Sequence, residues 1–325
     1  MKISIVFSII MALLLLLSAC NTIEGQKDNS ETSVAETISE SRGPAENQSS
    51  DSENVPSGIK ERFCDSEKLR VYRMNDGSIK AYVDEWGKEY ELPSMFVADP
   101  EDSSSRTIRA CFLGDSIYIT NIEKTGDATV VIKSAKLSKN SDKAVCGNTD
   151  VELNCVYLDD EPFSFEPQSA WLSFYEDDHG ALFLGDNYLT RHLTVLKTAD
   201  GGVTWAKAGD DSNLKTDSWH EWVDFARFVS ENEGMVSYSY YGYEEMCDRT
   251  FVTIDGGKTW KKLSVDYDSN TPADTPDDGC AYEATSLDVE NGVYKLTLRR
   301  YNGRINLPDV YMTSDRIDSG YKFTE

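Results

Sequence analysis

An eight-residue pattern occurs twice in the second half of the chain, and no other feature restricts the fold as much. The copies run from Thr198 to Trp205 and from Thr253 to Trp260, and both fit Ser/Thr-x-Asp-x-Gly-x-Thr-Trp. Each copy lies between two short apolar runs, which is typical of a β-hairpin and its turn. In such a turn the aspartate accepts backbone hydrogen bonds, glycines take positive φ, and the tryptophan packs beneath. Two such hairpins predict a repeated, antiparallel β-structure.

The two copies share ten positions, which are Thr198, Asp200, Gly202, Thr204, Trp205, Thr253, Asp255, Gly257, Thr259 and Trp260. The spacing from Trp205 to Trp260 defines the period of the repeat. A degenerate third copy near the C-terminus keeps Asp318, Gly320 and a final aromatic, Phe323, with Arg316 at the Ser/Thr position. A fainter match ends at Tyr90, about two periods before the first copy.

These segments resemble the Asp-box, or BNR repeat, of β-propeller proteins such as sialidases, sortilin-like receptors and photosystem II stability factors. In that family the box joins the third and fourth strands of a four-stranded blade. The resemblance covers roughly residues 166–325 and implies an all-β propeller in which the Asp, Gly and Trp of the box are structural. It says little about activity, because the box usually lies far from the ligand face.

Residues 61–325 accommodate about five blades at one blade per period. The expected blade limits are 61–104, 105–165, 166–221, 222–270 and 271–325. Six shorter blades, or a separate β domain before residue 165, are the alternatives. No sustained 3.6-residue apolar period is present in this region, so helix is expected to be scarce.

Residues 1–19 are expected to be an export signal. Lys2 precedes an almost wholly apolar run of about 15 residues, which is short for a membrane span. The run ends in Leu17-Ser18-Ala19-Cys20, which resembles the lipobox of bacterial lipoproteins. That resemblance implies cleavage before Cys20 and a lipid on its sulfur, with the protein at the cell membrane on its extracytoplasmic side.

Residues 20–60 are rich in Ser, Glu, Asn and Thr and poor in large apolar side chains, which predicts a disordered acidic stalk. The whole chain has a net charge of −25, and residues 21–60 hold only eight acidic and three basic residues. Most of the negative charge therefore belongs to residues 61–325. Nucleic acid is excluded as a partner by this charge, which favours neutral or cationic partners.

Six cysteines follow Cys20, and an even number in an exported domain favours disulfides over metal thiolates. They are Cys64, Cys111, Cys146, Cys155, Cys247 and Cys280. No Cys-x-x-Cys pair is present, and fifteen pairings are open. The propeller resemblance implies bridges between neighbours, namely Cys64–Cys111, Cys146–Cys155 and Cys247–Cys280.

Two aromatic stretches are candidates for the ligand face, Trp219–Trp222 and the tyrosine-rich tract that begins at Tyr238. Their representative residues are Trp219, Trp222, Tyr240 and Tyr241. Such rings stack on sugars, but packing between blades is the alternative role for each. No cofactor is expected, and the three histidines lack the spacing of metal ligands.

The resemblance does not extend to sialidase catalysis. Sialidases carry Arg-Ile-Pro in the first blade, whereas the nearest string here is Arg304-Ile305-Asn306 in the last blade. We therefore expect a non-catalytic binder of an extracellular protein or carbohydrate. The alternatives are a glycoside hydrolase, which needs only two suitably spaced carboxylates, and an assembly or stability factor for a membrane complex.

Overall fold

The computed structural model describes residues 36–40, 58–66, 68–97, 106–126, 129–153, 170–185, 193–209, 222–239, 250–263, 280–302 and 305–324. All regular structure in these residues is β, apart from one turn of 3-10 helix, η1 (Ser94–Phe96). No helix in this part of the chain is long and apolar enough to cross a membrane.

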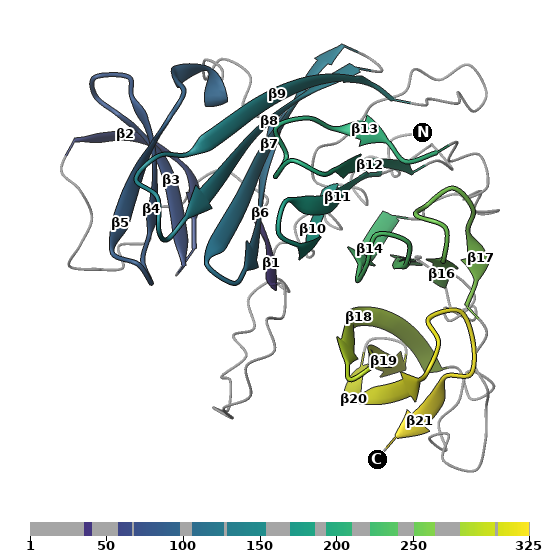
Figure 1. The fold of residues 1–325 in the computed structure, drawn as a ribbon. Coiled ribbons are helices and arrows are strands. Elements are labelled where there is room, and N and C mark those ends of the chain that lie inside the picture. The colour runs from purple at the N-terminus through teal and green to yellow at the C-terminus, as the bar shows by residue number, and fades with distance from the viewer. Residues whose placement is uncertain are drawn as a thin grey trace, which may run out of the picture. The chain divides into compact units, whose positions relative to one another are not determined.

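Five antiparallel sheets follow one another along the chain (Figure 1). The first contains β2 (Ile59–Asp65), β3 (Leu69–Met74), β4 (Ile79–Val83) and β5 (Lys88–Leu92). The second contains β6 (Arg106–Leu113), β7 (Ser116–Gly126), β8 (Thr129–Ser138) and β9 (Val145–Glu152), with β1 (Glu36–Glu40) added beside β6.

The third sheet contains β10 (Ala170–Glu176), β11 (His179–Leu184), β12 (Thr194–Thr198) and β13 (Ala206–Lys207). The fourth contains β14 (Trp222–Phe228), β15 (Gly234–Ser239), β16 (Thr250–Thr253) and β17 (Lys261–Lys262). The fifth contains β18 (Cys280–Glu290), β19 (Val293–Asn302), β20 (Ile305–Ser314) and β21 (Lys322–Thr324).

Each sheet has the strand order of a propeller blade. Its four consecutive strands pair in chain order, and the first strands of neighbouring sheets contact one another, β6 with β10, β10 with β14 and β14 with β18. The fold is therefore all-β and matches a propeller of five blades. The expected fold class is confirmed; the third, fourth and fifth sheets lie within their expected blade limits, whereas the first begins at Ile59 and the second includes β1.

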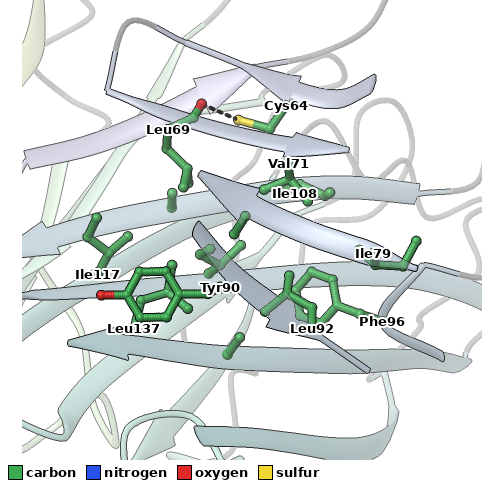
Figure 2. Close-up of a cluster of buried hydrophobic side chains, with 14 of the residues drawn as sticks. Cys64, Leu69, Val71, Ile79, Tyr90, Leu92, Phe96, Ile108, Ile117 and Leu137 are labelled. Atoms are coloured by element: carbon green, nitrogen blue, oxygen red, sulfur yellow. Dashed lines mark hydrogen bonds between the residues drawn. The ribbon is translucent and has the colours of Figure 1, made fainter. Parts of the chain in front are cut away.

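The hydrophobic core consists of clusters between successive sheets. Figure 2 shows the cluster between the first two sheets, where the Tyr90 ring of β5 lies near Ile117 and Leu137 of the second sheet and Leu92 lies beside Phe96. Further clusters join the second sheet to the third, the third to the fourth, and the fourth to the fifth. Both faces of the second, third and fourth sheets are thus covered, which explains why strands such as β11 are apolar along most of their length.

The segment expected to be a disordered stalk contributes a strand. β1 lies within residues 20–60 and pairs antiparallel with β6, from Glu36 opposite Phe112 to Glu40 opposite Ile108. Composition did not indicate this, because an edge strand can be held by backbone hydrogen bonds that any non-proline residue provides. The ordered sheets also begin at Ile59, two residues before the expected boundary.

The expected Cys64–Cys111 disulfide is wrong, because both residues are thiols, and Cys64 of β2 packs against one face of the second sheet whereas Cys111 of β6 points from the other face. Ile108 and Ala110 of β6 face the first sheet together with Cys64, whereas Cys111 belongs to the cluster with the third sheet. Successive side chains of a strand alternate between faces, so Cys111 points away from Cys64. The Cys64 thiol donates to the carbonyl oxygen of Leu69, as Figure 2 shows.

The expected Cys146–Cys155 bridge is not formed either. Cys146 is a thiol that packs against the core between the first two sheets, and burial raises its pKa. Cys155 and Cys247 lie outside the described residues, and the side chain of Cys280, the first residue of β18, is also not described. The Cys247–Cys280 pairing stays a prediction.

Candidate ligand-binding end

The two ends of the sheets differ in how the strands are connected. At one end, here named the turn end, the first strand of each sheet leads into the second, and the third into the fourth, through short turns such as 114–115 and 199–205. At the opposite end, the connection end, longer chain segments lead from each of the first four sheets to the next. These segments are 93–105, 153–169, 208–221 and 263–279. Long connections on a rigid scaffold are where binding residues concentrate.

The first repeated turn joins β12 to β13 at the turn end. The Asp200 carboxylate accepts hydrogen bonds from the Thr204 amide (2.9 Å) and the Thr204 hydroxyl (2.7 Å). The Thr198 hydroxyl donates to Asp200 (2.8 Å) and accepts from the Gly202 amide (2.9 Å). Burial acts to raise the pKa of Asp200, but these hydrogen bonds outweigh it and hold the pKa below its usual value.

The second repeated turn joins β16 to β17 with the same bonds. Asp255 accepts from the amide and hydroxyl of Thr259, and the Thr253 hydroxyl accepts from the Gly257 amide. Gly256 and Gly257 both have positive φ, which glycine adopts without strain. Trp260 is buried beneath the turn, and its indole donates to the Gly257 carbonyl oxygen. The two turns thus share one pattern of hydrogen bonds around the aspartate and the first threonine.

The third turn, between β20 and β21, differs in register from the sequence alignment. Ser314 ends the third strand and accepts from the amide two residues on, as Thr198 does in the first turn. Tyr321 directly precedes the fourth strand and is fully buried, so it takes the place of Trp205. The expected Phe323 lies two residues further on, within β21.

The charges of this third turn are also arranged differently. Arg316 does not stand at the Ser/Thr position but forms a two-bond ion pair with Asp318, with both distances 2.9 Å. Gly320 has positive φ. The Arg316–Asp318 ion pair thus takes the place of the central aspartate network that the first two turns have.

The turn end is occupied by contacts between sheets. A Cβ atom added to Gly147 of β9 would lie 2.2 Å from the backbone oxygen of Val203 in the first repeated turn. The same contact recurs one sheet later, where Gly209 approaches the backbone of Lys258. β9 in the second sheet, and the residues directly after β13 in the third, thus lie against the repeated turn of the next sheet. Backbones this close leave no room for a ligand between them.

Two lysines connect neighbouring sheets at the turn end. Lys136 of β8 pairs with Asp178 in the turn after β10 (2.6 Å), and Lys197 of β12 donates to the carbonyl oxygen of Glu231 in the turn after β14. The Lys197 ammonium also lies 4.0 Å from the centre of the Phe228 ring. Burial lowers the pKa of Lys197 to about 8. Lys197 could not be predicted from the sequence, because only the tertiary structure brings the aromatic ring close to it.

Of the four aromatic candidates, only the backbone of Trp222 lies within the described residues. Trp222 is the first residue of β14 and pairs with Ser239, the last residue of β15. Tyr240 and Tyr241 directly follow β15, and Trp219 lies three positions before β14. The side chain of Trp222 and the residues Trp219, Tyr240 and Tyr241 are outside the described part.

Two tyrosine–glutamate pairs have the residue types of a glycosidase nucleophile pair, but their tyrosines have a raised pKa. The Tyr72 hydroxyl donates to Glu89 (2.5 Å), and the Tyr294 hydroxyl donates to Glu233 (2.6 Å). Burial and the carboxylate both raise the pKa of each tyrosine. A phenol with a raised pKa stays protonated near neutral pH, so these tyrosines are not activated nucleophiles.

Several described carboxyl groups have a lowered pKa. Every described carboxyl whose pKa is shifted is shifted downward; these are Asp76, Glu89, Asp142, Asp200, Asp255 and Asp318. A glycosidase needs one carboxylic acid with a raised pKa. Within the part of the chain that the structure describes, no cluster of His, Cys, Asp and Glu has the arrangement of a metal site. His179 lies at the turn end, where Nδ1 is 3.0 Å from the carbonyl oxygen of Asp177.

Comparison with known proteins gives matches among solved structures alone. No protein family matches the chain, and no curated protein matches it. One solved structure that matches is an α-L-arabinanase from Penicillium chrysogenum in complex with arabinobiose, with 12% sequence identity and a TM-score of 0.35. The match covers 64% of this chain and 63% of the arabinanase, so the chain spans less than two thirds of that protein. The five sheets themselves, rather than this likeness, define the fold.

Proposed function

We propose that this protein is a lipid-anchored, extracytoplasmic binding protein whose propeller takes a protein or carbohydrate at its connection end, without catalysis. The observation that carries the proposal is the difference between the two ends. The turn end is closed by short hydrogen-bonded turns that contact the neighbouring sheet, whereas the connection end carries the long segments and the aromatic candidates. Ligand sites of scaffolded β-folds are built from such connections.

The repeated turns have a structural role in this proposal. We take the turns at Thr198–Trp205 and Thr253–Trp260 to be Asp-boxes, because each has the hydroxyl–aspartate–amide network and the buried tryptophan that the motif requires. Their position between third and fourth strands supports this assignment. The boxes hold neighbouring sheets together at the end opposite the ligand.

The chemistry of the ligand follows from charge and from aromatic residues. A net charge of −25 disfavours anionic polymers and favours neutral or cationic groups. Trp219, Trp222, Tyr240 and Tyr241 supply flat apolar faces that suit sugar rings or the side chains of a protein partner. A neutral glycan or a cationic protein segment meets both conditions.

The binding proposal is tested by screening the full chain against an array of neutral, cationic and anionic glycans and peptides. Binding is expected for neutral or cationic members. The variant Trp219→Ala/Tyr241→Ala should weaken that binding tenfold or more, because two stacking faces are lost. The matched control Tyr311→Ala removes an exposed ring from β20 and should leave affinity unchanged. Binding restricted to anionic members, or unchanged in the double variant, would contradict the proposal.

Catalysis is tested on the same glycans. We expect no product release above the rate without protein, because none of the described carboxyls with a shifted pKa has the raised value of a general acid. Turnover that one carboxylate substitution abolishes would establish the glycoside hydrolase alternative. Stoichiometric recovery of one membrane complex from native membranes, with no glycan bound, would favour an assembly factor instead.

The anchor is tested by Cys20→Ser. Removing the only sulfur at the lipobox should release the protein from the membrane into the soluble fraction, because no thioether to diacylglycerol can form. The control Ser18→Ala keeps a small residue before the cleavage site and should stay in the membrane. Membrane retention of Cys20→Ser would contradict lipid anchoring.

A further inference from the structure

Three polar side chains lie together on the face of the second sheet that packs against the first sheet. Asn121 and Glu123 of β7 share this face with Ile119, which belongs to the core between the two sheets. Lys133 of β8 pairs directly with Asn121 across the strands. Directly opposite side chains of an antiparallel pair have Cβ atoms about 4.5–5.5 Å apart. The Lys133 amine and the Asn121 amide are therefore within reach of each other.

The Glu123 carboxylate connects the amine to the amide. Its Oε1 accepts a hydrogen bond from Nδ2 of Asn121 (2.7 Å), and its Oε2 accepts one from Nζ of Lys133 (2.5 Å). The Asn121 Nδ2 also donates to the carbonyl oxygen of Phe96 (2.6 Å). These two bonds use both N–H groups of the amide and fix its orientation. One carboxylate thus contacts both nitrogens, where it can carry a proton from one to the other.

The three side chains are buried. Asn121 is 0% exposed, and the side chains of Lys133 and Glu123 are 12% and 11% exposed. The Oδ1 of Asn121 has no hydrogen-bond partner among the described residues, which adds to the free-energy cost of burying the group. A proton transfer from Lys133 to Glu123 leaves two neutral groups, and neutral groups cost less to bury than charges. The burial therefore suits a reaction that consumes the ion pair.

A second asparagine lies beside the same lysine and provides an internal comparison. Asn148 of β9 pairs directly with Lys133 on its other side, and it is exposed. Cross-strand spacing alone would allow either asparagine to meet the amine. Burial and the shared Glu123 carboxylate select Asn121.

We propose that the side chains of Lys133 and Asn121 become joined by an amide bond, which the protein forms itself with Glu123 as the proton carrier. Lys133 first passes a proton to Glu123. The neutral Nζ then attacks Cγ of Asn121, and Glu123 gives its proton to Nδ2 while it takes a second proton from Nζ. The Cγ–Nδ2 bond breaks and ammonia leaves, and no oxidant or cofactor is consumed. Glu123 is a catalytic residue in this step, because it contacts both reacting groups.

The bond connects β7 to β8 covalently within the second sheet. The three cysteines whose side chains the structure describes, Cys64, Cys111 and Cys146, are thiols. An amide forms without an oxidant and is not broken by reductants, so it provides a cross-link that these thiols do not. This inference is independent of the proposed binding function and of the proposed anchor.

Peptide mapping of the full chain by mass spectrometry tests the bond directly. Trypsin does not cleave after an acylated lysine, so cleavage after Lys133 should be lost in the wild type. The peptides that contain Asn121 and Lys133 should appear as one joined species, lighter than their sum by one ammonia. Separate peptides of unmodified mass would overturn the proposal. Ammonia can also leave from Asn291–Gly292 by succinimide formation, and loss confined to that site would overturn it as well.

Three variants separate this reaction from a simple buried ion pair. Lys133→Arg keeps the positive charge without the amine nucleophile, and Asn121→Leu keeps a side chain of similar size without the amide. Both should abolish the joined peptide. Glu123→Gln keeps both reacting groups and should lower the joined fraction at least about tenfold, because an amide cannot take up the proton. Wild-type joining in Glu123→Gln would overturn the assigned mechanism.

Asn148→Ala is the matched control, because it removes the exposed asparagine on the other side of Lys133. The joined peptide should form to the wild-type extent in this variant. Loss of the joined peptide in Asn148→Ala, with joining retained in Asn121→Leu, would assign the bond to the other pair and overturn the proposal. Circular dichroism shows whether each variant is folded. The wild-type map decides the proposal even if a variant does not fold, because it needs no substitution.

Discussion

The indole at the end of each repeated turn packs the turn against its own sheet. Trp205 is buried, packs edge-on against Phe174 of its own sheet, and donates to the Ser134 hydroxyl of the preceding sheet. Trp260 repeats the edge-on contact with Phe228, but donates within its own turn. The two tryptophans therefore share a packing role and differ in what they bridge.

Trp205→Ala is expected to lower the free energy of unfolding by about 3–5 kcal/mol, because a large buried side chain is removed. Denaturant unfolding monitored by circular dichroism measures the change. Tyr311→Ala, at an exposed ring, is the control and should change stability by less than about 0.5 kcal/mol. A loss below about 1 kcal/mol for Trp205→Ala would contradict its position in the core.

Gly147→Ala tests the close approach between the second and third sheets. The added methyl group meets the backbone of Val203, which cannot rotate away, so we expect a loss of about 1–3 kcal/mol from overpacking. The neighbouring Asn148→Ala points to solvent and is the matched control. Thermal unfolding measures the stability of both variants. Equal melting temperatures for Gly147→Ala and Asn148→Ala would show that the contact is absent.

Lys197 gives stability a distinct pH dependence. Burial lowers its pKa to about 8, so between about pH 8 and pH 10 the unfolded chain binds more protons at this position than the folded chain. Stability from this group therefore rises with pH across that window. Lys197→Met should remove the rise, and Lys207→Met, on the exposed strand β13, should keep it. Parallel pH profiles of wild type and Lys197→Met would contradict the burial of this amine.

Single strands determine which residues meet, and β6 is the clearest case. Its alternating faces send Ile108 and Ala110 to the core with the first sheet and Cys111 to the core with the third. A count of cysteines in the sequence shows an even number, but it does not show on which face of a sheet each one lies. The disulfide prediction paired cysteines that are neighbours in the chain. The alternation of side chains along β6 explains why Cys64 and Cys111 do not pair.

The cysteine assignment is testable by alkylation. When the protein is unfolded in guanidinium chloride with iodoacetamide and no reductant, Cys64 and Cys111 should both be modified, since both are thiols. In the folded protein they should react slowly, because both are buried. Mass spectrometry of peptides measures both states. A disulfide-linked peptide containing Cys64 and Cys111 would contradict the structure.

The sequence predicted the hairpins of the repeated turns more accurately than the residue alignment of the third turn. The motif at Asp200 and Asp255 predicted two hairpins between third and fourth strands, because its turn chemistry is local. The third turn was misaligned by two residues, since its Arg316–Asp318 pair replaces the central aspartate and hides the roles of Ser314 and Tyr321. β1 was missed because its pairing with β6 depends on a distant strand edge.

At the scale of the whole molecule, the spacing of the two repeated turns predicted five blades, and five sheets follow one another in the chain. The candidate ligand residues were predicted from residue type alone, and of the four only the backbone of Trp222 lies within the described residues. Lys197 and the close contact at Gly147 were not predictable, because each depends on the packing of one sheet against the next.

The central claim is that ligand binding belongs to the connection end. Amide hydrogen exchange of the full chain, with and without the ligand found on the array, tests it most directly. We predict that ligand binding slows amide exchange in segments 208–221 and 240–249. Exchange in the repeated turns at 199–205 and 254–260 should stay the same. Protection confined to those turns, with none in the connecting segments, would contradict the account.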